Sequence, residues 1–228
     1  MSILIKSAKI IDASSKFNGK TKDIFINQGI IQEIADSIVK KAAKEITLDN
    51  LHVSQGWLDT GVCFGEPGLE ERETIENGSL TACLSGFTDI ILNSNTLPVV
   101  DSKADVIYIK SKNKNNALKI HPLAALTIKS EGNEMAELRE MFDSGAVGFY
   151  DYKMSVKNPN LLKIALQYVQ HFDGLIMTFP FEKAICKDGQ INEGEISTLY
   201  GLEGIPSISE EIILERDLKI LEYTGGKL

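Results

Sequence analysis

The chain has 228 residues, of which 24 are Lys or Arg and 32 are Asp or Glu, so its formal net charge is −8. This acidic balance excludes nucleic acid or an anionic membrane surface as the main partner, because both favour basic patches. Hydrophobic residues make up 43% of the chain and charged residues 25%, values that are typical of a folded globular protein rather than a disordered one.

The first part of the chain, residues 1–54, is predicted to form a small β module. Short apolar or alternating runs, which favour strands, occur at 3–5, 8–11, 23–27, 30–34, 46–48 and 51–53. Gln28-Gly29 is a turn signal inside this series. Strands this short bury little core by themselves, so we expect the module to be thin.

Residues 55–228 alternate between predicted strands and predicted helices. Strands are expected at 57–64, 87–93, 118–128, 146–150 and 175–179, and helices at 70–85, 103–111, 134–144, 160–172 and 207–223. This alternation predicts parallel strands joined by crossover helices, hence an α/β sheet or barrel. The units are too few to close an eight-stranded barrel, which takes ~250 residues. A doubly wound open sheet would be complete, but no G-x-G-x-x-G or P-loop follows any predicted strand.

The cysteines and the N-terminus indicate the compartment. Cys63, Cys83 and Cys186 are too few and too scattered for a disulfide framework or a zinc knuckle. The opening MSILIKSAKIID lacks the basic region and long apolar stretch of a signal peptide. No apolar run approaches the ~20 residues that cross a bilayer. We therefore predict a cytoplasmic protein.

The most informative segment runs from Trp57 to Pro98. It contains Asp59, the run Glu66-Pro67-Gly68, the helical stretch 73–78 and Asn95-Thr96-Leu97-Pro98. These motifs, in this order, resemble the dihydroorotase branch of the metal-dependent amidohydrolases. Further matches follow at 145–149, 192–194, 204–206 and 211–217, so the resemblance spans essentially the whole chain.

The resemblance implies an α/β fold of the amidohydrolase type, a TIM barrel preceded by part of a small β-sandwich. On this template, residues 1–54 are the partial sandwich and residues 55–228 are an incomplete barrel with about the first five β/α units. The sequence stops where the sixth barrel strand should begin, so we expect a truncated chain, a fragment of a longer one.

The resemblance also implies a metal site from which this chain departs. Family enzymes use one or two divalent ions as Lewis acids to activate water and polarise a cyclic amide. Gly61 and Cys63 occupy the positions of the His-x-His pair on the first strand, and Phe179 that of the histidine on the fifth. Glycine and phenylalanine offer no donor atom, and one thiolate is a poor replacement for two imidazoles. We therefore expect no metal ion, no cofactor and no catalytic residue.

Other positions keep candidate functional side chains. Asp151 matches the bridging acid of the fourth strand and is a candidate metal ligand, whereas Gly65 replaces an arginine that binds the substrate carboxylate. Asn95 is either a substrate-binding residue or a turn residue beside Pro98. Structural roles are expected for the histidines, His52, His121 and His171.

Two functional hypotheses follow from the resemblance. The favoured one is a non-catalytic dihydroorotase-like protein of pyrimidine biosynthesis with a structural or assembly role, and with aspartate transcarbamoylase or a second copy of itself as partner. The alternative is an active, divergent dihydroorotase or cyclic amidohydrolase. It would hold zinc through Asp151, Cys63 and histidines beyond Leu228. Metal content and turnover of dihydroorotate distinguish the two.

Overall fold

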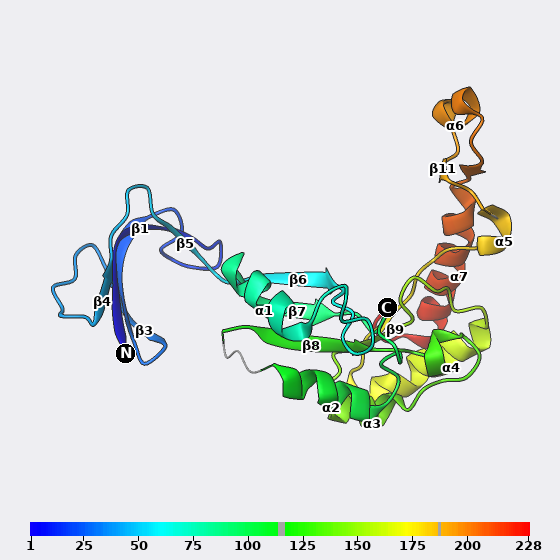
Figure 1. Ribbon diagram of the computed structural model, residues 1–228, viewed down its shortest axis with the longest axis horizontal. Helices are drawn as coiled ribbons and strands as arrows, with labels where there is room; N and C mark the ends of the chain where they lie inside the picture. The colour runs from blue at the N-terminus through cyan, green and yellow to red at the C-terminus, as the bar shows by residue number, and fades with distance from the viewer. Residues whose placement is uncertain (114–116, 187) are drawn as a thin grey trace. The chain divides into compact units, whose positions relative to one another are not determined.

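A computed structural model describes residues 1–113, 117–186 and 188–228 of the chain (Figure 1). Contacts between residues divide it into two units, Met1–Gly56 and Trp57–Leu228. Among the described residues, no helix has both the length and the apolar character needed to cross a membrane.

The N-terminal unit is a β-sheet with the strand order β3-β2-β1-β4, in which β5 also pairs with β1. Its strands are β1 (Ser2–Ile11), β2 (Thr21–Asn27), β3 (Ile30–Ala35), β4 (Lys44–Ile46) and β5 (His52–Ser54). The pairs β1–β2 and β2–β3 are antiparallel, whereas β4 and β5 run parallel to β1. The predicted turn at Gln28-Gly29 is confirmed, since both residues have positive φ and join β2 to β3.

A small apolar cluster stabilises this unit. Leu4, Phe25 and Ile38 are its buried members. The apolar runs at 3–5 and 8–11 belong to a single strand, β1, whose pairing with β2 is irregular between Ile5 and Ala8. The backbone N–H of Ser7, within that irregularity, donates to the buried Asp23 across 2.9 Å. A polar contact to a neighbouring strand therefore replaces regular pairing there.

The second unit is built on a parallel sheet with the order β10-β9-β8-β7-β6. Its strands are β6 (Trp57–Val62), β7 (Phe87–Leu92), β8 (Lys119–Ala124), β9 (Gly148–Tyr150) and β10 (Ile176–Met177). Each strand pairs with the next along the chain, as the alternation of strands and helices predicts. The result is a half-barrel of parallel strands.

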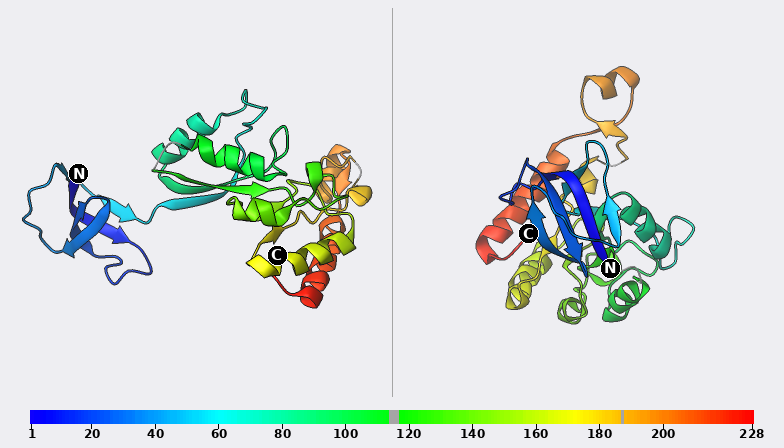
Figure 2. Two further views of the ribbon diagram at one scale, coloured as in Figure 1. Left: turned by 90° about the horizontal axis from the view of Figure 1, so that it is seen from below. Right: turned by 90° about the vertical axis from the view of Figure 1, so that its left-hand side faces the viewer.

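Helices follow the strands of this sheet in turn. They are α1 (Ile75–Leu84), α2 (Lys103–Lys112), α3 (Leu138–Asp143), α4 (Pro159–Val169) and α7 (Ile208–Thr224), with short 3-10 helices η1 (Ile128–Ser130) and η2 (Gln170–Phe172). In the right-hand view of Figure 2 these helices form an arc outside the strands. The core between the two layers includes Ile90 on β7, Ala124 on β8, Phe149 on β9 and Leu162 on α4, all at most 1% exposed.

Helix α1 begins later than the sequence pattern predicts. The predicted helix spans 70–85, but α1 starts at Ile75. Two acceptors define this start: Thr74 Oγ1 accepts from Asn77 N across 3.2 Å, and Glu66 Oε2 accepts from Ile75 N across 2.8 Å. Because these acceptors cap the first N–H groups, the helix begins at Ile75. The residues before Thr74 form turns instead of a further helical turn.

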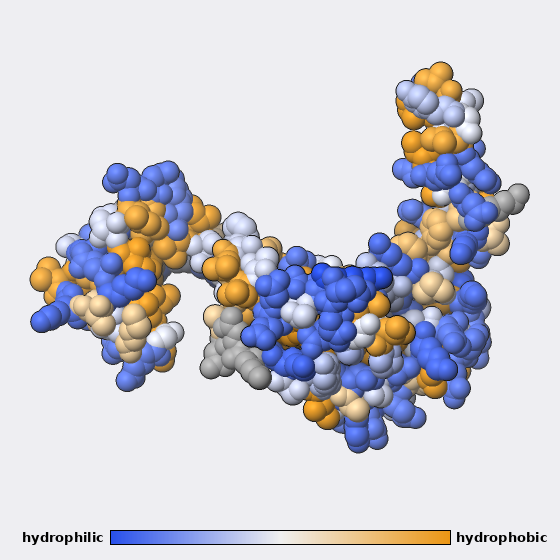
Figure 3. All heavy atoms as spheres, in the orientation of Figure 1, coloured by the Kyte–Doolittle hydropathy of each residue, from blue (hydrophilic) through white to orange (hydrophobic). Residues whose placement is uncertain are grey.

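Between β10 and α7 the chain forms short elements that the sequence analysis does not predict. They are α5 (Lys183–Cys186), β11 (Ile191–Asn192), α6 (Glu195–Tyr200) and β12 (Gly204–Ile205), with β11 and β12 paired in parallel. Apolar side chains gather at the surface of α6 (Figure 3), where Leu199 is 74% exposed. Elements this short carry too little periodicity to be recognised from sequence.

Candidate functional site

The carboxyl ends of the parallel strands are where barrel enzymes place their active sites. In this chain β6 leads into Cys63, β7 into Asn93, β9 into Asp151 and Tyr152, and β10 toward Phe179.

The exposed thiol of Cys63 is held by two polar neighbours. Asn93, which is 4% exposed, donates from Nδ2 to Cys63 Sγ across 3.4 Å and to Val62 O across 3.1 Å. A hydrogen bond between Cys63 and Tyr152, together with partial burial, raises the pKa of the Tyr152 phenol to about 12. The structure therefore brings together ends of β6, β7 and β9 around a sulfur atom, an amide and a phenol.

Asp151, the candidate metal ligand, is directed away from this cluster. It is 2% exposed, and Oδ1 accepts from Leu126 N and Thr127 N across 2.9 and 3.0 Å. Oδ2 accepts from Thr127 Oγ1 across 2.6 Å. Burial raises the pKa of Asp151, although these hydrogen bonds act in the opposite direction. Both carboxylate oxygens are thus engaged by the loop after β8.

The other residues that the sequence analysis assigns to ligand positions, Gly61 and Phe179, have no donor atom in their side chains. Gly61 is exposed, and its N–H donates to Asp59 Oδ1 across 2.9 Å. Phe179 is half-buried, with its ring centroid 5.6 Å from that of Phe181. Gly65, at the position of the family arginine, has φ +126°, and a Cβ there would lie 2.5 Å from Leu69 O. The backbone at this position is therefore suited to glycine and to no larger residue.

The loop that carries Asn95 is fixed against the Glu66-Pro67-Gly68 run. Leu97 N donates to Pro67 O across 3.0 Å, and a Cβ on Gly68 would lie 1.7 Å from Leu97 O. Asn95 itself is half-buried, and its side chain has no hydrogen-bond partner among the described residues. The structure thus places the asparagine on an ordered loop without assigning its side chain a structural contact.

Glu66 contributes to this arrangement from a buried position. Glu66 is 7% exposed. Its carboxylate accepts hydrogen bonds from Ile75 N and, across 3.0 Å, from Tyr108 Oη. It also forms an ion pair with Lys112 Nζ at 3.1 Å. The pKa of Glu66 is lowered from its usual value. Burial alone would raise this pKa, but the hydrogen bonds from Ile75, Lys112 and Tyr108 outweigh the effect of burial. The charged carboxylate therefore caps α1 and joins it to α2.

The residues present do not fit a zinc site. Within the described ranges, no cluster of three His, Cys, Asp or Glu side chains has a geometry that could hold a metal ion. Of the histidines, His121 pairs through Nε2 with Asp89 Oδ1 at 2.8 Å, and His52 Nδ1 contacts Asn50 O at 2.8 Å. Cys63 and Asp151, the remaining donors at the strand ends, face different neighbours.

Comparison with known proteins identifies the family. The profile of the family described as "Dihydro-orotase-like" matches residues 52–227. The chain belongs to this family. It is similar to a dihydroorotase of Pelotomaculum thermopropionicum, with 35% identity over all of this chain and 53% of that protein. It is also similar to a dihydroorotase of Acetivibrio thermocellus, with 36% identity over 97% of this chain and 52% of that protein. The chain thus spans about half the length of the curated relatives it matches.

Solved structures agree with the architecture. An L-hydantoinase (dihydropyrimidinase) of Arthrobacter aurescens matches 98% of this dihydroorotase-like chain with a TM-score of 0.77 and 18% identity, using 51% of its own length. A dihydroorotase structure matches 99% of the chain with a TM-score of 0.58 and 13% identity, over 63% of its own length. The expected amidohydrolase-type TIM-barrel fold is confirmed by these matches.

Sequence reasoning missed several residues that shape the site. Asn93 and Tyr152 contact Cys63, yet neither belongs to a motif that singles it out. Their proximity to Cys63 depends on the pairing of β6 with β7 and on the return of the chain through β8 and β9. One signal was available: Asn93 is the last residue of the predicted strand 87–93, the end at which barrels commonly place functional residues.

Proposed function

We propose that this chain is a dihydroorotase-like protein of pyrimidine biosynthesis that does not itself hydrolyse dihydroorotate and that has a structural or assembly role. A single observation carries the proposal: the ligand positions at the strand ends hold Gly61, Cys63 and Phe179, while both oxygens of Asp151 accept hydrogen bonds from the loop after β8. Hydrolysis of a cyclic amide through a metal-activated water needs several nitrogen or oxygen donors around one ion.

The family supports the pathway and the class of protein. Relatives that are 35% and 36% identical are named dihydroorotase, and the hydrolase fold is retained. A structural neighbour, an N-acyl-D-glutamate deacylase, is described as complexed with zinc. We infer a cytoplasmic location from the few, scattered cysteines and from the biosynthetic role.

Metal content and turnover of the purified chain test the proposal. We expect far less than one zinc ion per chain by elemental analysis after dialysis against a zinc-containing buffer, and no formation or hydrolysis of dihydroorotate. Stoichiometric zinc together with turnover would establish the alternative, an active divergent cyclic amidohydrolase. Zinc bound without turnover would contradict the inference from the donor set while leaving the non-catalytic role intact.

A variant with restored donors sharpens this test. Gly61 has an ordinary φ, and the nearest atom to a Cβ at this position, Asp59 Oδ1, is 3.9 Å away. The double substitution Gly61→His and Cys63→His should therefore fold. If the missing imidazoles limit metal binding, the double variant should bind zinc more tightly than the wild-type chain. Equal zinc content would show that another feature of the site limits binding.

We propose aspartate transcarbamoylase, or a second copy of this chain, as the assembly partner. Large apolar side chains exposed at the surface support association, among them Trp57 at 59% and Leu84 at 80% in the second unit. Co-purification with tagged aspartate transcarbamoylase, followed by light scattering of the chain alone, tests the two partners. A monomer that retains no transcarbamoylase would contradict both.

A further inference from the structure

A cavity of about 280 Å³ lies between the loop after β9, the loop after β10 and helix α7. Among the described residues, its lining includes the cations Lys153, Lys157, Lys183 and Arg216 and the anion Glu182. The chain as a whole carries a net charge of −8. The positive lining thus opposes the charge of the whole chain and creates a local potential that attracts anions.

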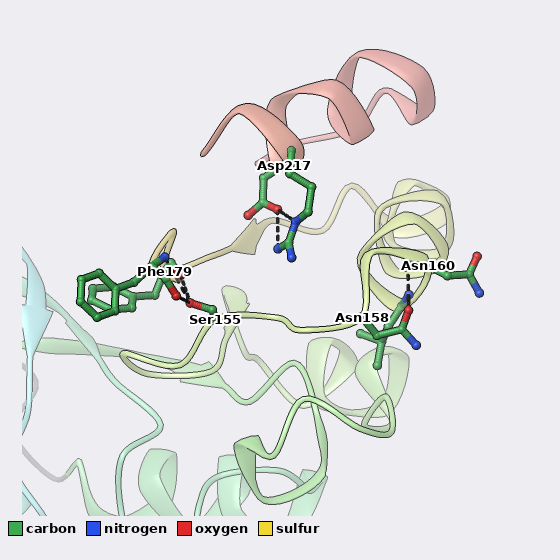
Figure 4. Close-up of polar contacts among 8 residues, drawn as sticks. Ser155, Asn158, Asn160, Phe179 and Asp217 are labelled. Atoms are coloured by element: carbon green, nitrogen blue, oxygen red, sulfur yellow. Dashed lines mark hydrogen bonds and ion pairs between the residues drawn. The ribbon is translucent and has the colours of Figure 1, made fainter. Parts of the chain in front are cut away.

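A buried carboxylate positions the arginine at this cavity. Asp217, 1% exposed on α7, accepts through Oδ1 from Arg216 Nε across 2.9 Å and from Arg216 Nη2 across 2.7 Å. Figure 4 shows Asp217 on the side of α7 that faces the loop carrying Ser155. The guanidinium is held by these two bonds, and its Nη1 makes no hydrogen bond within the part of the chain that the structure describes. A planar donor with a free edge suits a carboxylate or a phosphate.

The wall opposite α7 is tied together by Ser155. Its hydroxyl donates to Phe179 O across 2.8 Å and also contacts Phe181 O, and it accepts from Phe181 N across 3.2 Å (Figure 4). The rings of Phe179 and Phe181 lie 5.6 Å apart with an interplanar angle of 44°. The apolar lining of the cavity includes Met154, Val156 and Ile213. The cavity therefore has an apolar surface beside its cations.

The three lysines of the lining have no internal counter-ion. Lys153, Lys157 and Lys183 pair with no carboxylate among the described residues. Their ammonium groups are therefore available to a ligand. Pockets that bind small molecules usually measure ≈ 300–1,000 Å³. At about 280 Å³ this cavity is slightly smaller, so it suits a small ligand such as one ring with a single acidic substituent.

We propose that this cavity binds a small organic anion. Arg216 and Lys157 contact its carboxylate or phosphate group, and its apolar body packs against the apolar lining formed by Met154, Val156 and Ile213. The proposal concerns binding alone, and it does not depend on whether the chain is catalytic. It requires none of the side chains that surround the Cys63 thiol.

Nuclear magnetic resonance titration of the intact 228-residue chain tests the proposal. Benzoate and phenyl phosphate are the probes, benzamide is the uncharged analogue and inorganic phosphate lacks the ring. We expect saturable shifts of the backbone signals of Val156 and Phe179 with either aromatic anion. Inorganic phosphate should bind more weakly, benzamide should give no saturable shift, and added NaCl should weaken the binding of both aromatic anions.

Variants identify the groups that hold the anion. Lys157→Gln should weaken benzoate binding several-fold, and Arg216→Gln by roughly tenfold or more, since a hydrogen bond to a charged group is lost. Lys219→Gln, on the same helix but 81% exposed in its side chain, is the matched control and should bind like the wild-type chain. Because Arg216→Gln leaves Asp217 without its cation, Lys157→Gln keeps the test valid if that variant does not fold.

Three results would overturn the proposal. The first is the absence of any saturable shift with either aromatic anion. The second is equal binding of benzamide and benzoate, which would remove the role of the cations. The third is an equal loss of affinity in Lys157→Gln and Lys219→Gln, which would indicate attraction to positive charge in general.

Discussion

Thr127 donates its hydroxyl hydrogen to Asp151 Oδ2 across 2.6 Å, and its backbone N–H donates to Asp151 Oδ1 across 3.0 Å. Thr127 Oγ1 in turn accepts from Gly132 N across 2.8 Å. One buried side chain on the loop after β9 therefore organises the loop after β8. A carboxylate that the sequence marks as a candidate metal ligand has a structural task in this chain.

The first prediction concerns Asp151. Asp151→Ala leaves the N–H groups of Leu126 and Thr127 without an acceptor in the interior, which should lower the free energy of unfolding by about 2–4 kcal/mol. Asp151→Asn keeps an acceptor for these groups and avoids burying a charge, so it should be much milder. Urea denaturation measures both. Equal stability of Asp151→Ala and the wild type would contradict this account.

A second prediction concerns the contact between the two motif loops. Gly68→Ala places a Cβ 1.7 Å from Leu97 O at a residue with φ +88°, so the loop must move and the melting temperature should fall by several degrees or more. Gly61→Ala is the matched control, because no atom lies closer to its Cβ than 3.9 Å. Similar melting temperatures for the two variants would show that the loop adapts at little cost.

Glu66 provides the third prediction. Glu66→Ala removes the acceptor for Ile75 N and the partner of Tyr108 and Lys112. We expect a loss of about 1–3 kcal/mol in the free energy of unfolding and faster hydrogen exchange at the start of α1. Glu76→Ala, exposed in the first turn of the same helix, should change either quantity little. Unchanged exchange at Ile75 and Asn77 in Glu66→Ala would contradict the capping role.

The fourth prediction is a pH dependence in the N-terminal unit. Burial raises the pKa of Asp23, but hydrogen bonds from Lys6, Ser7 and Ile38 outweigh it and lower the pKa below its usual value. A lowered pKa in the folded state adds stability above the unfolded pKa, about 3.9, and that stability is lost as the pH falls through the folded pKa. Signals of β1 and β2 in an acid titration should therefore report loss of structure below about pH 4.

The control for this titration is Asp36→Asn. The Asp36 side chain is 89% exposed, so its removal should leave the acid transition of β1 and β2 in place. Asp23→Asn should weaken the pH dependence and lower stability at neutral pH. An unchanged acid transition in Asp23→Asn would assign the effect to other carboxylates.

Local sequence patterns predict the order of the main helices and strands of the second unit, but not all of the residues at which these elements begin and end. The strands that begin at Trp57 and Phe87 and the helix ending before Gly225 lie where the apolar periodicity places them. The predicted strand at 118–128 was too long, because β8 ends at Ala124 and the N–H groups of Leu126 and Thr127 donate to Asp151 instead of a neighbouring strand. Asp151 is distant in sequence from this segment, so no local pattern predicts these hydrogen bonds.

The candidate site shows the same division. The motif alone predicts that Gly61, Cys63 and Phe179 stand where the family has histidine ligands. The orientation of Asp151 depends on how separate β/α units pack, because its partners Leu126 and Thr127 lie on the loop after β8, and side-chain direction across such units has no signature in a single sequence.

The close fit of Gly68 against Leu97 O bears on how genomes are searched for enzymes of this kind. A search keyed to the Glu-Pro-Gly and Asn-Thr-x-Pro signatures selects for the residues that form this backbone junction, which leaves no space for a side chain at Gly68. Such a search therefore finds proteins that share the fold, whether or not they are catalytic. Sorting active from inactive descendants requires reading the strand-end positions separately.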